Sequence, residues 1–181
     1  SGIAGLTQLK GKRVSLGEKG SGTLATTRLL LKAFGLSEKK VKAQYLAVGT
    51  AANKLAAGEL DAIFIVGGHP IPAIADLAET TPISLLPIDG KTASDFRDKY
   101  PFLTVDLIPA GAYRDSKPTI TIGIGASWVV TADLDADLAY GLARALWHPS
   151  TRRLLSSGNP IGRQVRIETA LAGLPIPLHD G

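Results

Sequence analysis

The chain has 181 residues, 45% hydrophobic and 20% charged, a balance typical of a globular protein that buries a sizeable core. The formal net charge of +4 comes from scattered lysines and arginines, which argues against a nucleic-acid-binding surface. The sequence has no cysteine and no apolar run of about eighteen residues, which excludes disulfides, thiolate metal sites and a membrane-spanning helix. We therefore expect a soluble protein or a trimmed piece of an exported one.

A glycine-rich turn stands between a strand-like run and a helical pattern. Residues 14–16 predict a short strand, and residues 17–23 read GEKGSGT. From Thr23 the spacing of apolar residues predicts an amphipathic helix that stops at Gly35. Phosphate-binding loops are built in the same order, so this turn is the first candidate site. The apolar positions of the helix are Leu24, Leu30, Leu31 and Phe34.

Strand and helix patterns continue to alternate through the first hundred residues. Residues 41–48 predict a second strand, and GTAANKLAAGEL predicts a helix with Thr50 at its N-cap and Gly58 at its end. DAIFIVGG is apolar and β-branched, as in a strand buried on both faces of a parallel sheet. HPIPAIADLAET predicts a turn feeding a helix, ISLLPI a further strand, and Ser94–Tyr100 a short helix. This alternation predicts an α/β fold with a parallel sheet flanked by helices.

The remaining third of the chain has a different pattern. Residues 100–117 read as irregular, and PTITIGIGASWVV then predicts a long strand that runs between two bodies. Asp135–Trp147 and Ser150–Ser157 predict two helices. The change of composition near Ile120 is the one plausible lobe boundary.

The glycine turn fits neither of the two common nucleotide motifs completely. Gly17 and Gly22 have the P-loop spacing, but Thr23 stands where the phosphate-binding lysine is required. Gly20, Gly22 and Ala25 fit the dinucleotide pattern, yet no acidic residue follows the second strand to hold a ribose hydroxyl.

What both motifs share is a set of backbone N–H groups at the start of a helix. Such groups attract an anion, and a carboxylate needs no lysine because it carries a single charge. The candidate ligand-binding residues of the turn are Gly20, Ser21, Gly22 and Thr23, with hydroxyl donors from Ser21 and Thr23. The alternative is that Ser21 only caps the helix and the glycines only make the turn.

Several stretches together resemble a known family over essentially the whole chain. These are LKGKRVSLGEKGSGT, VGTAANKLAAGELDAIFIVGGHPIPAI, IPAGAY, TIGIGASWVVTADLDADLAYGLARALW and GLPIPLHDG. They resemble the TAXI family, the solute receptors of tripartite ATP-independent periplasmic (TRAP) transporters. The resemblance implies a type II periplasmic-binding-protein fold of two α/β lobes, a periplasmic or extracytoplasmic location, and a small carboxylate ligand such as glutamate or 2-oxoglutarate. It implies no cofactor, and the membrane subunits of the transporter as partners.

The family carries an N-terminal segment, ahead of LKGKRV, that this sequence does not show. The resemblance therefore implies that residues 1–118 form the second lobe, and that residues 119–181 form the returning hinge strand and helices of an incomplete first lobe. We expect that such an incomplete lobe could support a dimer.

Further candidate ligand contacts lie outside the glycine turn. Gly67, Gly68 and His69 follow a predicted buried strand, where parallel sheets hold ligands, although the neighbouring prolines could simply fix a helix start. Tyr113 suits a cleft wall or packing between lobes. Thr50 could donate a second hydroxyl. Arg114 and Arg163 could pair with a distal carboxylate, with surface solvation the stronger alternative.

No pattern of catalysis or metal binding is complete. DLDADL opens like a calcium loop, but Leu138 and Arg144 occupy positions where glycine and glutamate are needed. The three histidines are separated in sequence, and no G-x-S-x-G elbow occurs. We therefore expect a binding protein rather than an enzyme: the receptor of a TRAP-type transporter or, alternatively, the ligand-sensing domain of a signalling system with the same fold.

Overall fold

A computed structural model describes residues 2–158, 160–174 and 176–181. The chain divides into two compact units. The N-terminal unit comprises Ser1–Lys99 and Val105–Ile122, and the C-terminal unit comprises Tyr100–Thr104 and Gly123–Gly181. The sequence placed the lobe boundary at residues 118 and 119, and the correspondence of these units to the two lobes of a receptor stays a prediction.

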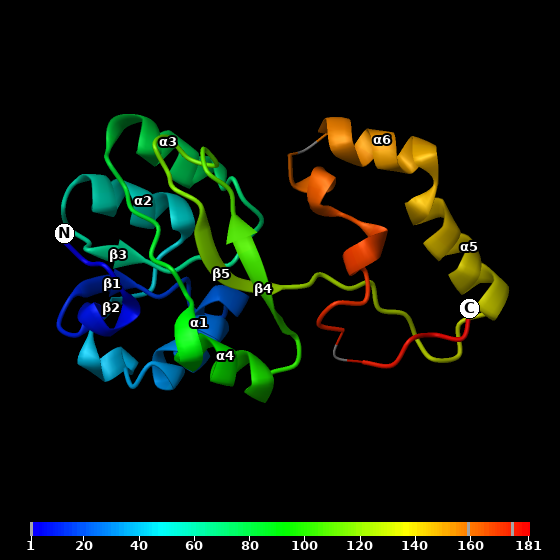
Figure 1. The fold of residues 1–181 in the computed structure, drawn as a ribbon, viewed down its shortest axis with the longest axis horizontal. Coiled ribbons are helices and arrows are strands. Elements are labelled where there is room, and N and C mark those ends of the chain that lie inside the picture. The colour runs from blue at the N-terminus through cyan, green and yellow to red at the C-terminus, as the bar shows by residue number, and fades with distance from the viewer. Residues whose placement is uncertain (1, 159, 175) are drawn as a thin grey trace. The chain divides into compact units, whose positions relative to one another are not determined.

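The N-terminal unit is built on a three-stranded parallel sheet (Figure 1). Its strands are β1 (Arg13–Ser15), β2 (Lys42–Gln44) and β3 (Ala62–Ile63), in the order β2-β1-β3. Val14 pairs with Ala43 on one side and with Ala62 on the other. The parallel sheet predicted from the alternation of strands and helices is therefore confirmed. The two-residue β3 lies at the sheet edge and is only half-buried, because one side has no neighbouring strand.

Four helices cover the two faces of this sheet. They are α1 (Gly22–Ala33), α2 (Val48–Ala56), α3 (Pro72–Thr80) and α4 (Gly90–Lys99). Figure 1 shows α2 and α3 on one side of the sheet and α1 and α4 on the other. Buried leucines line the layer formed by α1 and α4, with Leu24, Leu30 and Leu31 of α1 each at most 5% exposed. The short 3-10 helices η1 (Leu6–Leu9) and η2 (Glu38–Lys40) complete the unit.

The end of α1 follows from its sequence. Gly35 has φ +70°, a left-handed conformation that side chains other than glycine seldom adopt. Its N–H donates to the carbonyl of Lys32, and the N–H of Leu36 donates to the carbonyl of Leu31. These two bonds satisfy carbonyls that the helix leaves free at its end. The predicted stop at Gly35 is confirmed.

Several predicted elements are wrong. Residues 83–88 form no strand, although the N–H of Ile88 donates to the carbonyl of Ile120. Helix α4 begins at Gly90 rather than at Ser94. The stretch 100–117, predicted to be irregular, contains strand β4 (Leu103–Ile108).

The long strand predicted over residues 118–130 is also wrong in extent. Only its first part forms a strand, β5 (Thr119–Ile124), which pairs with β4 in a separate two-stranded sheet. Both strands contain a point at which the chain passes from one unit to the other. Strand pairing, which links residues distant in the sequence, decided these assignments against the local pattern.

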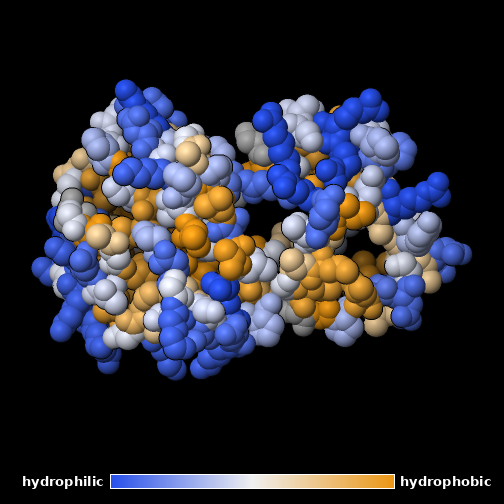
Figure 2. Space-filling model, in the orientation of Figure 1, coloured by the Kyte–Doolittle hydropathy of each residue, from blue (hydrophilic) through white to orange (hydrophobic). Residues whose placement is uncertain are grey.

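The C-terminal unit consists mainly of helices. It contains α5 (Ala136–Trp147), α6 (Pro149–Gly158) and the 3-10 helices η3 (Pro160–Gln164) and η4 (Ile167–Thr169). The two α-helices predicted in this region are confirmed. Within the described part of this unit, Leu103 alone is buried. Large apolar side chains are therefore left at its surface, where Figure 2 shows them in orange.

Candidate functional site

The candidate site lies at the carboxyl edge of the parallel sheet. Because β1, β2 and β3 are parallel, the segments that follow them emerge at the same edge. These segments are the glycine turn, residues 45–47 and residues 64–71. The first leads into α1, the second into α2 and the third into α3. This is the edge at which open α/β sheets bind ligands.

Glycine is required at position 17 in the turn. Gly17 is buried and has φ +99°. A Cβ built there would lie 2.6 Å from Cγ2 of Thr23, closer than two carbon atoms can approach. The turn therefore packs its first glycine directly against the second residue of α1.

Ser21 caps α1. Its Oγ accepts from the N–H of Leu24 at 3.1 Å and donates to the carbonyl of Glu18 at 2.6 Å. The cap satisfies one of the free N–H groups at the helix start and leaves others open. Among the described residues, none accepts a hydrogen bond from the N–H groups of Gly22 and Thr23.

The two glycines on either side of Ser21 have open surroundings. Gly20 and Gly22 are exposed, and nothing lies within 4 Å of a Cβ built on either. The helix of twelve residues adds a partial positive charge at this end. A cap at Ser21 and N–H groups that bond to no described residue thus occur together, and ligand binding by Gly20, Ser21, Gly22 and Thr23 stays a prediction.

Thr50 does not cap α2, contrary to the prediction. The helix begins two residues earlier, with Ala47 at its N-cap and no side-chain cap bond. Thr50 is the third residue of the helix and is exposed. Local spacing misplaced the start because Val48 and Gly49 continue the helix instead of the strand. No acceptor in the described part of the chain is bonded to the N–H groups of Val48, Gly49 or Thr50.

The loop that carries Gly67, Gly68 and His69 lies between β3 and α3. Val66 and Gly67 are exposed, and Gly68 and His69 are half-buried. The bond between His69 and Pro70 is cis. The N–H of Val66 donates to Oγ1 of Thr23 at 3.2 Å, which links this loop to the start of α1.

Tyr113 lies beneath that loop. Its side chain is 4% exposed and belongs to the core cluster that includes Ala52, Ile74 and Leu77. Its hydroxyl accepts from the N–H of Ile71, the N-cap residue of α3, at 3.1 Å. The ring therefore packs inside the N-terminal unit, and a contact between Tyr113 and a ligand stays a prediction.

Sequence reasoning missed two side chains at the same edge. The Lys19 ammonium lies 5.7 Å from the ring centre of Tyr45, which follows β2. The Tyr45 hydroxyl donates to Glu38 at 3.1 Å, and partial burial together with this bond raises the pKa of Tyr45. Lys19 was visible inside the glycine turn, but its stacking on Tyr45 had no sequence signal. The exposed Glu18 beside it carries the opposite charge.

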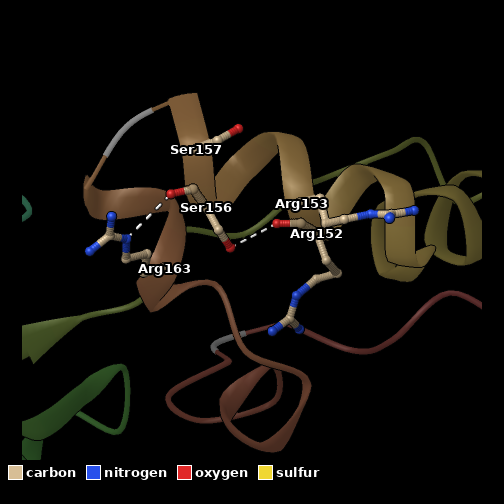
Figure 3. A pocket seen from close by; sticks show the side chains of 5 residues that line it. All are labelled: Arg152, Arg153, Ser156, Ser157 and Arg163. Atoms are coloured by element: carbon tan, nitrogen blue, oxygen red, sulfur yellow. Dashed lines mark hydrogen bonds between the residues drawn. The ribbon is translucent and has the colours of Figure 1, made fainter.

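The arginines considered as carboxylate partners have different surroundings. Arg114 donates to the carbonyl of Glu79 at 2.9 Å and lies 3.4 Å from its carboxylate, which agrees with a surface role. Arg163 lines a hollow in the C-terminal unit with Arg152, Arg153, Ser156 and Ser157 (Figure 3).

That hollow does not gather its cations around one point. Figure 3 shows the three arginine side chains pointing in different directions. Arg163 Nε donates to the carbonyl of Ser156 at 3.3 Å, and Ser156 Oγ donates to the carbonyl of Arg152 at 2.8 Å. The hollow is thus held by bonds to its own backbone, and its arginines do not converge on a ligand as a binding site requires.

The described ranges contain no group of three or more histidine, aspartate or glutamate side chains that could hold a metal ion. Across the same ranges, no helix has both the length and the apolar character that crossing a membrane requires.

The fold and the open helix start define a class of protein. A parallel three-stranded sheet flanked by helices, with free N–H groups at its carboxyl edge, is consistent with part of a periplasmic-binding-protein-like domain. The chain belongs to the NMT1-like family, whose model matches residues 1–181. This family is periplasmic-binding-protein-like, and membership indicates a solute-binding role. Solute-binding families of this kind typically act outside the cytoplasm.

Proposed function

We propose that the chain is the ligand-binding part of an extracytoplasmic receptor for a small carboxylate, such as glutamate or 2-oxoglutarate. The observation that carries this proposal is the pair of unpaired N–H groups of Gly22 and Thr23 at an exposed helix start. The narrower assignment to the TAXI family and to TRAP-type transport rests on the sequence resemblance and goes beyond the family match.

The chemistry of this helix start favours a carboxylate over a phosphate ester. Two N–H groups can each donate to one carboxylate oxygen, and each bond to a charged acceptor contributes about 1.5–3 kcal/mol. The helix dipole adds roughly 0.3–1 kcal/mol at an exposed site. A phosphate with two negative charges would need a convergent cation, whereas Lys19 is directed over Tyr45 and is offset by Glu18.

The partners follow from this role. A receptor that has closed on its ligand would dock on the membrane subunits of the transporter. We propose no nucleic-acid partner and no chemical turnover: the bound acid should be recovered unchanged by mass spectrometry after incubation. The large apolar side chains exposed on the C-terminal unit would favour a dimer, which sedimentation can detect.

One substitution removes a single donor from the site without disturbing the helix. Gly22 is the first residue of α1, where proline is favoured, and Ser21 already has the extended conformation that a following proline demands (φ −79°, ψ 152°). Gly22→Pro deletes the N–H group, and Gly22→Ala keeps it while adding a methyl group in open space. Titration calorimetry with glutamate and 2-oxoglutarate should show affinity reduced about 10- to 100-fold in Gly22→Pro and nearly unchanged in Gly22→Ala.

A control for the proline itself lies in the C-terminal unit. Ala136 is the first residue of α5, and Asp135 before it has φ −56° and ψ 130°, outside the helical region that a following proline disfavours. Ala136→Pro should leave carboxylate affinity unchanged. Equal affinity in Gly22→Pro and the wild-type chain, or no heat from any acid tried, would contradict the proposal.

A further inference from the structure

The loop of residues 67–70 is held at both of its ends by side chains from other parts of the chain. At one end, the N–H of Val66 donates to Oγ1 of Thr23 in the first turn of α1, at 3.2 Å. At the other end, the N–H of Ile71 donates to the hydroxyl of Tyr113, at 3.1 Å. Four residues between two anchored amides have little freedom to move away from the start of α1.

The first anchor is itself fixed in place. The methyl group of Thr23 packs where a Cβ of residue 17 would otherwise lie, because Gly17 leaves that space open. With the methyl group against Gly17, the hydroxyl oxygen is directed to Val66. The orientation of Thr23 is therefore set by packing on one side and by a hydrogen bond on the other.

The second anchor is equally restrained. The Tyr113 side chain is 4% exposed within the core cluster of α2 and α3. The N–H of Tyr113 donates to Oγ of Ser116 at 3.1 Å, and the N–H of Ser116 donates to the carbonyl of Tyr113 at 3.0 Å. This tight turn presents the tyrosine hydroxyl to Ile71 from a rigid support.

We infer that Thr23 and Tyr113 are positioning residues that hold loop 67–70 beside the helix start, so that this loop distinguishes one carboxylate from another. The inference rests on the proposed carboxylate site. Backbone N–H groups bind the carboxylate group common to all such acids and cannot separate glutamate from 2-oxoglutarate by themselves. Discrimination must come from groups that meet the rest of the ligand, and loop 67–70 is tied directly to the second residue of α1.

The test uses two matched variants of Thr23. Thr23→Val keeps the shape of the side chain and removes the acceptor for Val66, whereas Thr23→Ser keeps the acceptor. Hydrogen exchange of the Val66 amide, measured without ligand, should become about tenfold faster in Thr23→Val and stay near the wild-type rate in Thr23→Ser. The ratio of the affinities for glutamate and 2-oxoglutarate, measured by calorimetry, should change severalfold in Thr23→Val alone.

Tyr113→Phe provides the same test at the other end of the loop. It removes the acceptor for Ile71 and leaves the ring in the core, so exchange of the Ile71 amide should accelerate and the affinity ratio should shift. A variant that only lost stability would lower both affinities by the same factor.

The outcomes separate this inference from the carboxylate proposal. An unchanged affinity ratio in both Thr23→Val and Tyr113→Phe overturns the inference even when the wild-type chain binds both acids. If the wild-type chain binds neither acid, the carboxylate proposal fails and discrimination fails with it. Unchanged exchange of Val66 in Thr23→Val overturns the anchoring whether or not any acid binds.

Discussion

The two units of this protein contain similar helices whose apolar side chains are buried to very different extents. In the N-terminal unit, α1 has a serine cap and buries Leu24, Leu30 and Leu31. In the C-terminal unit, α5 has an aspartate cap, in which Oδ1 of Asp135 accepts from the N–H of Leu138, yet α5 has no buried residue. Both helices have the same length of twelve residues. Local signals therefore form a helix in either unit, and burial depends on what the rest of the fold brings against it.

The exposed apolar side chains of the C-terminal unit show that this unit gains less stability from burial. Trp128 and Val129 are 71% and 69% exposed, and Leu154 is 71% exposed. Apolar surface stabilises a fold by about 25 cal/mol per Å² only when it leaves water. The N-terminal unit therefore has a hydrophobic core to hold it together, whereas the C-terminal unit relies on helix formation and local packing.

The test with the largest expected effect on stability replaces one leucine in each unit by alanine. Leu31→Ala, in the buried face of α1, should lower the free energy of unfolding by about 2–5 kcal/mol, since it leaves a cavity. Leu142→Ala, in α5, where the leucine is 43% exposed, should change it by about 0.5 kcal/mol. Urea unfolding followed by circular dichroism measures both.

The two units can be followed separately in the same experiment. Both tryptophans, Trp128 and Trp147, belong to the C-terminal unit, so tryptophan fluorescence reports that unit alone. We expect the fluorescence transition at lower urea than the main transition in circular dichroism. A single transition by both probes, or equal effects of the two alanine variants, would show that the units share one core.

A smaller effect is expected at the ion pair that joins β1 to the start of β3. Arg13 donates to Asp61 through its guanidinium at 2.7 Å and through its backbone N–H at 2.8 Å. Asp61→Asn should therefore destabilise the N-terminal unit by about 1–3 kcal/mol, because bonds to a charged group are lost. The unfolding transition in circular dichroism should move while the fluorescence transition stays.

The same pair predicts a pH dependence with a definite sign. The hydrogen bond from the Arg13 side chain is the main cause that lowers the pKa of Asp61 from 3.8 to about 2. A depressed pKa means that the stabilisation is complete above pH 3.8 and is lost as the pH falls towards 2. Asp61→Asn should lack this part of the acid dependence, and an identical acid profile in the variant would contradict the assignment.

The smallest expected effects come from the same glycine-to-alanine substitution in two helices, which should lower the stability of one helix and raise that of the other. Gly35→Ala forces a methyl group onto a residue with φ +70° and should destabilise α1 by about 1–2 kcal/mol. Gly141 lies inside α5 with nothing within 4 Å of its Cβ position, so Gly141→Ala should stabilise that helix by about 0.5–1 kcal/mol. Thermal unfolding of the two variants gives the signs, and two shifts of equal sign would refute the assignment of Gly35 to a left-handed helix end.

Helix ends that depend on contacts between neighbouring residues could be predicted from the sequence. Strands that depend on distant partners could be predicted less well. Ser21, Gly35 and Asp135 fix helix ends through contacts within a few residues, and each was readable from the sequence. The segment 83–88 has a strand-like composition but no ladder, and β4 lies between two prolines in a stretch that reads as irregular. Pairing between strands, not composition, decided both.

The candidate site shows the same division. The glycine turn was predicted, with a cap at Ser21 as the alternative to ligand binding, because both depend on one continuous stretch. The contacts of Thr23 with Val66, of Tyr113 with Ile71 and of Lys19 with Tyr45 join residues far apart in the sequence. A single sequence carries no signal for such pairs, and for that reason the bond between Tyr113 and Ile71 was not predicted, while Tyr113 was expected at a cleft wall or between the lobes.

The sequence by itself determined the parallel α/β class, the glycine turn and most helix ends, because hydrophobic periodicity and capping act over a few residues. The tertiary structure alone decided which N–H groups stay open, which loops are tied together at the sheet edge, and which apolar faces are covered. Those properties depend on contacts between distant parts of the chain, whose free energy exists only when the chain is folded.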